Sequence, residues 1–163
     1  SVHVITRFLR MGYLWDRVRV QGGAYGAFVR YSRNTGTLAF VSYRDPNVEK
    51  TLSVYKQTAE YLGNLHLTQE ELTKAIVGAM GDIDTYLLPS AKGNAALLEY
   101  ITGYTKKMRQ QVREEVLQTK LSDFHVFAPY LQKAMETSVD VALGGQQVQD
   151  HAAKAHWETI KLL

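Results

Sequence analysis

The chain has 163 residues, which is enough for one domain with a hydrophobic core. Its hydrophobic content of 45% and charged content of 21% are typical of a globular fold. The net charge of +3 is too small to indicate nucleic-acid binding by itself. The absence of cysteine excludes disulfide bonds and thiolate metal sites. No apolar run approaches the roughly 18 residues needed to cross a bilayer. We therefore expect neither a nucleic-acid partner nor a membrane partner.

The first predicted elements are a helix and a β-hairpin. The apolar stripe of residues 2–19 predicts an amphipathic helix, which is ended by Gly22-Gly23. Two runs rich in aromatic and β-branched residues, Ala24–Ser32 and Thr37–Tyr43, predict strands. The residues between them, 33–36, include Asn and Gly, which accept positive φ and favour a hairpin turn.

The middle of the chain is predicted to be helical. Asp45 is expected to cap a helix whose first position is Pro46, because proline is pre-set for that position. Thr68 and Glu71 have the spacing of a capping box, in which each side chain accepts from the other residue's backbone N–H. A further helix is expected to begin there, and Pro89 is expected to interrupt the helical pattern.

The last part of the chain is predicted to hold more helices and one short strand. Ser122 is expected to cap a helix, and Ser138–Leu143 alternates as a strand does. The remaining expected elements are helices over Ala91–Thr102, Thr105–Thr119 and Gln146–Ala155 and a tail over His156–Leu163.

Few strands and many helices indicate an α+β fold, with a small, mainly antiparallel sheet covered by several helices. No internal repeat or linker is visible, so we expect residues 1–163 to form a single domain. A hairpin plus one later strand makes a small sheet for this length. We therefore expect the first strands of the sheet to lie upstream, which would leave an unpaired edge.

The segment Gln21–Gly26 is the strongest candidate for a binding site, and it has two interpretations. In the first, Gly22 and Gly23 only form a tight turn, because glycine adopts positive φ without steric cost. In the second, the missing Cβ atoms let a ligand backbone approach closely, with Arg19 and Tyr25 on either side. An arginine and a phenol beside such a turn can polarise a peptide carbonyl. The residues alone leave both interpretations open.

Other candidate sites carry weaker signals. The histidines form no H-E-x-x-H or H-x-x-E-H pair, so surface or packing roles are expected for them. They are His3, His66, His125, His151 and His156. No serine lies in a G-x-S-x-G motif. The acids of Gly81–Asp84 are expected to bond locally at a helix end, and the basic residues within 106–113 are expected to face solvent.

Several segments resemble the C-terminal half of the presequence protease family, whose members are zinc peptidases (inverzincins) of the insulinase/pitrilysin superfamily. The similar segments, in chain order, are Tyr13–Gly26, Ser42–Asn47, Thr73–Ile76, Gly81–Asp84 and Pro89–Gly93. The first is long and rather specific, and the resemblance runs from about residue 8 to the end of the chain.

The resemblance implies a four-domain peptidase whose two homologous halves close around a peptide, each domain having a LuxS/metallohydrolase-like fold. Residues 1–163 would be most of the last domain, inactive when isolated. Zinc would be bound by an H-x-x-E-H motif in the N-terminal half, so no metal ligand or other cofactor is expected in this chain. The implied partners are that zinc-bearing half and a peptide substrate, such as a cleaved targeting peptide. The implied compartment is the cytoplasm in bacteria and the mitochondrial matrix or plastid in eukaryotes.

The resemblance also implies roles for the residues of the turn. Tyr25 would donate a hydrogen bond to the oxyanion of the tetrahedral intermediate, and Arg19 would hold a substrate carbonyl or carboxylate. Gly22, Gly23 and Ala24 would contact the substrate. The alternative hypothesis is a structural or peptide-binding module with no role in catalysis. A purely structural module would have no need of the pair Arg19 and Tyr25.

Overall fold

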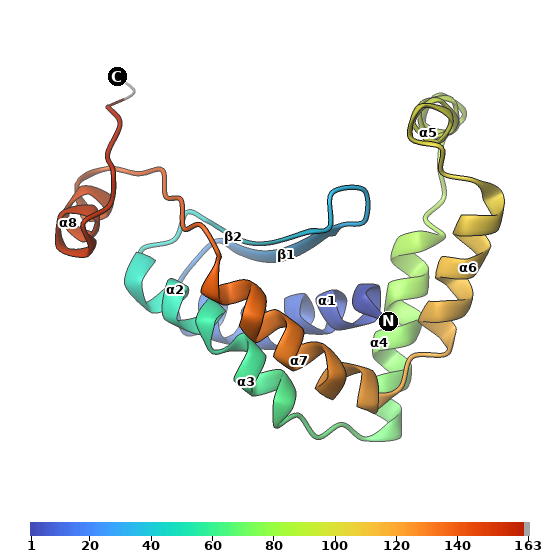
Figure 1. Cartoon of the computed structure of the whole chain (residues 1–163), viewed down its shortest axis with the longest axis horizontal. Coiled ribbons are helices and arrows are strands. Elements are labelled where there is room, and N and C mark those ends of the chain that lie inside the picture. Colours follow the sequence, from blue (N-terminus) through green and yellow to red (C-terminus); the bar gives the residue numbers. More distant parts are fainter. Residues whose placement is uncertain (162–163) are drawn as a thin grey trace.

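The computed structural model describes residues 1–161 and shows a mostly helical α+β fold around one β-hairpin (Figure 1). The elements in chain order are α1 (Val2–Met11), the π-helix η1 (Trp15–Val20), β1 (Gly26–Ser32), β2 (Thr37–Tyr43), α2 (Val48–Lys56), α3 (Thr58–Gly63), α4 (Gln69–Ile83), α5 (Pro89–Thr102), α6 (Lys106–Leu117), α7 (Leu121–Glu136) and α8 (Gln146–Ala155). The last two residues of the expected tail lie outside the described residues. No helix within residues 1–161 is long and apolar enough to cross a membrane.

The expectation of one continuous helix over residues 2–19 is wrong. α1 ends at Met11, because Gly12 has φ −116° and ψ −85°, outside the helical region. The chain then winds into the π-helix η1, where the Gln21 N–H donates to the Asp16 carbonyl at 2.9 Å, five residues back. This wider turn rotates the side chains of η1 relative to those of α1, so a single helical period cannot describe the whole segment.

Two predicted helix starts are also wrong. α2 begins at Val48 rather than Pro46. The Asp45 carboxylate instead accepts a hydrogen bond from the Asn47 N–H at 2.8 Å, which closes a local turn before the helix. α7 begins at Leu121, one residue before the expected cap at Ser122.

The capping box at the start of α4 is confirmed. The Glu71 N–H donates to the Thr68 hydroxyl at 3.2 Å, and the Thr68 N–H donates to the Glu71 carboxylate at 2.8 Å. These hydrogen bonds favour the ionised carboxylate and lower the pKa of Glu71 from its ordinary value of 4.5.

The lowered pKa of Glu71 predicts a component of stability that depends on pH. Because the folded-state pKa lies below the unfolded one, this stabilisation is present above pH 4.5 and is lost as the pH falls through the folded pKa. Glu71→Gln should remove this component, so the variant should lose less stability than the parent chain between about pH 6 and about pH 3. Thermal unfolding of both chains across this range measures the difference, and parallel curves would contradict the assignment.

The predicted strand over Ser138–Leu143 is wrong for this structure. β1 and β2 pair antiparallel with each other, and no third strand joins them within residues 1–161. Val139, Val141 and Leu143 are 85–86% exposed, so these alternating apolar side chains do not form the buried face of a sheet. Apolar alternation makes a strand only where a neighbouring strand satisfies the backbone donors and acceptors.

The hydrophobic core lies beneath the inner face of the hairpin, where α1 packs against β1 and α4 (Figure 1). α3 and α7 pack together on another side of the core. Strand alternation turns Ala27 and Val29 toward the core and leaves Phe28 exposed. The hairpin's outer face is therefore free, and it lies between α5 at one end of the molecule and α8 at the other.

Candidate functional site at the glycine turn

The π-helix η1 positions Arg19, the first of the two predicted site residues. The Arg19 guanidinium lies 3.8 Å from the centre of the Trp15 ring, within range of a cation–π interaction. Residues 15 and 19 meet because one helical turn separates them. Single π-turns are rare and are frequently found at functional sites. Arg19 is half-exposed, so its planar charge is held in place but remains open to a ligand.

The glycine turn itself has a full structural basis. Gly23 has φ +77°, in the left-handed region that glycine adopts readily. A Cβ atom on Gly22 would lie only 2.4 Å from the Val18 carbonyl oxygen, so no side chain fits there. The Gly22 carbonyl also accepts a hydrogen bond from the Asn47 side-chain amide at 2.5 Å, which ties the turn to the start of α2. Both glycines are thus required by the turn, whether or not a ligand approaches it.

Gly22 and Ala24 are buried in the described chain, and of the three predicted contact residues only Gly23 is exposed. Only Gly23 therefore presents its backbone to solvent here. Contact between this stretch and a substrate stays a prediction.

Tyr25, the second predicted site residue, leaves the turn with an exposed side chain. Its N–H donates to the Tyr43 carbonyl at 3.1 Å, which extends the hairpin pairing by one residue. Its ring meets the Tyr43 ring edge-on, with the ring centres 6.1 Å apart. The side chain is 66% exposed, and the phenol makes no hydrogen bond with the described residues. The hydroxyl is therefore positioned by its ring and open to an acceptor on a ligand.

Arg44 is a neighbour of the site that sequence reasoning did not assign. Its guanidinium lies 5.8 Å from the Tyr25 ring centre and 5.4 Å from that of Tyr43. Its φ of +48° is uncommon for a residue with a side chain, and such backbone positions cluster at functional sites. The one sequence signal was its place in the segment Ser42–Asn47, which resembles the peptidase family, because a backbone angle leaves no trace in residue type.

An apolar strip begins at Tyr25, which precedes β1 and contacts Tyr43, and continues over the outer face of the hairpin; we call Tyr25, Phe28, Val41 and Tyr43 the outer strip. Phe28 and Val41 are cross-strand partners, 40% and 43% exposed. The Phe28 ring leans over Gly26, where a Cβ atom would lie 2.9 Å from the ring. The outer strip thus forms an exposed apolar surface directly beside the turn.

Arg19 and Tyr25 are brought to the same turn but not into mutual contact. Within residues 1–161 no hydrogen bond or stacking contact joins them, and each has its own aromatic partner. Both side chains act as donors, one of them permanently charged. No three His, Asp or Glu side chains converge in the described part of the chain, so these residues do not fit a zinc site. The arrangement can bind and polarise a carbonyl oxygen.

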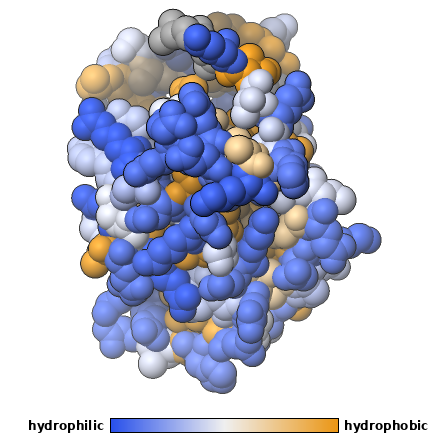
Figure 2. Space-filling model, turned by 90° about the vertical axis from the view of Figure 1, so that its left-hand side faces the viewer, coloured by the Kyte–Doolittle hydropathy of each residue, from blue (hydrophilic) through white to orange (hydrophobic). Residues whose placement is uncertain are grey.

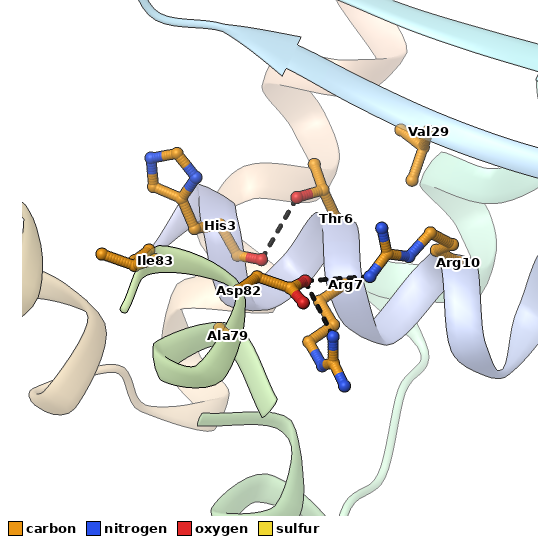
Figure 3. A pocket seen from close by; sticks show the side chains of 8 residues that line it. All are labelled: His3, Thr6, Arg7, Arg10, Val29, Ala79, Asp82 and Ile83. Atoms are coloured by element: carbon orange, nitrogen blue, oxygen red, sulfur yellow. Dashed lines mark hydrogen bonds and ion pairs between the residues drawn. The ribbon is translucent and has the colours of Figure 1, made fainter. Parts of the chain in front are cut away.

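A separate small pocket, of about 90 Å³, lies between α1 and α4 and holds a cluster of ion pairs (Figure 3). Asp82 pairs with Arg7 at 2.7 Å and with Arg10 at 2.9 Å. Asp84 pairs with Arg113 of α6 at 2.7 Å. The local bonding expected for these two carboxylates is therefore wrong, because both join elements distant in sequence. The pocket is explained by packing between helices.

Removing the Asp82 carboxylate should weaken the packing of α1 on α4. Asp82→Asn leaves Arg7 and Arg10 without their shared partner, and a partly exposed pair of this kind contributes about 1 kcal/mol. We expect a lower midpoint of thermal unfolding that differs less from the parent chain at high salt, because salt screens exposed pairs. A variant as stable as the parent at low salt would contradict this role.

The family of the chain follows from comparison with known proteins. The family model described as "PreP C-terminal domain" matches residues 1–143, which is most of the chain. The chain belongs to this family. The matched region includes the turn, the outer strip and helices α1–α7.

Relatives of the PreP C-terminal domain family occur in plants, fungi and bacteria. The chain is 45% identical over 93% of its length to presequence protease 1, chloroplastic/mitochondrial, of Arabidopsis thaliana. It is 31% identical over 99% of its length to the mitochondrial presequence protease of Emericella nidulans. It is 33% identical over 90% of its length to protein HypA of Clostridium perfringens. The chain spans only 14–15% of the length of these relatives.

Proposed function

We propose that the chain is the substrate-contacting, non-catalytic C-terminal part of a zinc endopeptidase that degrades unfolded peptides such as cleaved targeting peptides. The observation that carries this proposal is the placement of two donors, Arg19 and Tyr25, on either side of one rigid turn. The phenol is exposed and has no partner among the described residues. The apolar outer strip beside it suits the side chains of an extended peptide.

Tyr25 would act on the scissile carbonyl. As the carbonyl carbon becomes tetrahedral, its oxygen gains negative charge, and a positioned phenol donates a stronger hydrogen bond to that oxygen than to the ground state. One such donor contributes roughly 3 kcal/mol to stabilisation of the transition state. The edge-on contact with Tyr43 restricts the ring and so reduces the cost of positioning it.

Arg19 would hold the peptide in register. Its guanidinium is planar and permanently charged, and it presents donors that match a carboxylate or a peptide carbonyl. Stacking on Trp15 fixes the plane of these donors. Arg19 would therefore contribute to binding and orientation of the substrate.

The partner implied by this proposal is the N-terminal half of the same enzyme. Zinc held there supplies an activated water and polarises the carbonyl, a function that the residues of this chain do not fit. The names of the eukaryotic relatives place those proteins in mitochondria or chloroplasts. We propose the same compartments for a eukaryotic source and the cytoplasm for a bacterial one.

Reconstitution tests the proposal. The isolated chain should not cleave a fluorogenic peptide, and adding a separately produced fragment that holds the rest of the enzyme, including its zinc-bearing N-terminal half, should restore zinc-dependent cleavage. A chain carrying Arg19→Ala should bind that fragment as tightly but restore much less activity. Cleavage by the isolated chain would overturn the proposal. Full activity with the Arg19→Ala chain would favour the alternative, a structural module.

A further inference from the structure

Helix α5 is oriented with its large apolar side chains toward solvent. Leu97, Leu98, Tyr100 and Ile101 are 56%, 62%, 86% and 68% exposed. Residues three and four positions apart lie side by side on a helix, so these four form one continuous face. No residue of α5 is buried. The large residues of a helix in a water-soluble fold normally face the core.

Another face of α5 is the one turned toward the rest of the chain. Its half-buried residues are Ala91, Ala95 and Glu99, spaced four apart. Glu99 forms an ion pair with Arg109 of α6. α5 makes no extensive contact with any other helix or strand among the described residues. The ion pair and the small alanines thus lie on the side of α5 opposite its apolar face.

The apolar surface continues beyond the helix. In the segment that leads into α5, Tyr86 and Leu88 are 78% and 63% exposed. The face of the molecule that carries α8, α2 and α3 is different, because hydrophilic residues predominate there and the hydrophobic ones are mostly scattered (Figure 2). Scattered apolar residues are normal on a protein surface, whereas a contiguous apolar patch marks an interaction site.

We propose that the outward face of α5 is a docking surface covered by another part of the same polypeptide, outside residues 1–163. Two observations select this occupant. The chain spans only 14–15% of relatives that contain it, so most of such a polypeptide lies elsewhere. The family match includes α5, so this helix belongs to the shared domain. The face carries no charge of its own, which suits a permanent apolar contact within one protein.

This interface is separate from the proposed roles of Arg19 and Tyr25. Figure 1 shows α5 at one end of the molecule, on the side of the hairpin's tip, whereas the turn lies at the opposite end of β1, before Gly26. The docking surface therefore stands even if the turn has no part in catalysis, and its test needs no measurement of activity.

Photo-crosslinking in a full-length family member that carries this chain tests the proposal. Benzoylphenylalanine is introduced in place of Tyr100, which is aromatic and 86% exposed, so the change is small and requires no repacking. After irradiation, mass spectrometry identifies the crosslinked peptide. We expect a crosslink within one polypeptide, to a segment outside residues 1–163, with a yield independent of protein concentration.

The matched control carries the same photo-reactive residue in place of Lys154, which is exposed on α8 at the other end of the molecule, on the mainly hydrophilic face. It should give little of this crosslink. A product with twice the mass of the full-length protein would assign the face to a second copy. A crosslink formed only with added peptide would assign it to substrate. Either result, or the absence of any crosslink at Tyr100 and at a second site replacing Leu98, would overturn the proposal.

Discussion

Tyr25→Phe in a full-length enzyme of this family is expected to lower kcat/KM about 100-fold, which corresponds to roughly 3 kcal/mol of transition-state stabilisation. The change removes only the hydroxyl, and the ring keeps its edge-on contact with Tyr43. Because the hydrogen bond would strengthen as the oxyanion forms, most of the loss should be in kcat, with KM little changed. Steady-state cleavage of a fluorogenic peptide measures both constants.

Tyr43→Phe is the matched control, because it removes a hydroxyl from the neighbouring ring of the same cluster. It should leave kcat/KM within a few-fold of the parent enzyme if only the Tyr25 phenol meets the reacting carbonyl. Zinc content should be unchanged in both variants, since the described residues form no metal site. Near-normal activity of Tyr25→Phe would remove the oxyanion role and leave Tyr25 as a surface residue.

Gly22→Ala is expected to destabilise the turn by about 2–3 kcal/mol, because the new Cβ atom would overlap backbone rather than a movable side chain. That atom would lie 2.4 Å from the Val18 carbonyl oxygen and 3.1 Å from that of Arg17. Relief of the clash requires η1 and the turn to separate, which also displaces Arg19. Thermal unfolding of the chain measures the loss of stability.

Gly23→Ala separates the effect of space from the effect of backbone conformation. Gly23 has φ +77°, but the nearest atom to an added Cβ is the Pro46 Cγ at 3.6 Å, an ordinary contact. We expect this variant to lose only about 1 kcal/mol, the cost of a left-handed conformation. Equal losses of stability at the two positions would show that the close approach at Gly22 adds little to the cost of an alanine there.

Local signals in the sequence predicted much of the fold. Thr68 and Glu71 predicted a capping box because each side chain satisfies a donor only three residues away. The hairpin followed from two β-rich runs and a turn that accepts positive φ. In contrast, the alternation over Ser138–Leu143 predicted a strand that does not form here, because pairing depends on a neighbouring strand that a local pattern cannot specify.

The candidate site was predictable only in part. Resemblance pointed to Arg19 and Tyr25, but the sequence did not indicate their aromatic partners, Trp15 within η1 and Tyr43 across the hairpin, or the left-handed backbone of Arg44. The sequence likewise left open whether the glycines serve a turn or a ligand. The short distance between a Cβ atom added at Gly22 and the Val18 carbonyl oxygen explains the need for glycine there, because a side chain would clash with the backbone.

The sequence by itself determined the α+β class, most helix positions and the family, because these depend on local periodicity, capping residues and ordered motifs. Only the tertiary structure decided which faces the elements bury. It placed the inner face of the hairpin on α1, brought the Tyr43 ring against Tyr25, and turned the apolar face of α5 outward. Orientation depends on contacts between residues distant in the chain, such as the ion pair of Glu99 with Arg109, and periodicity within one element does not encode it.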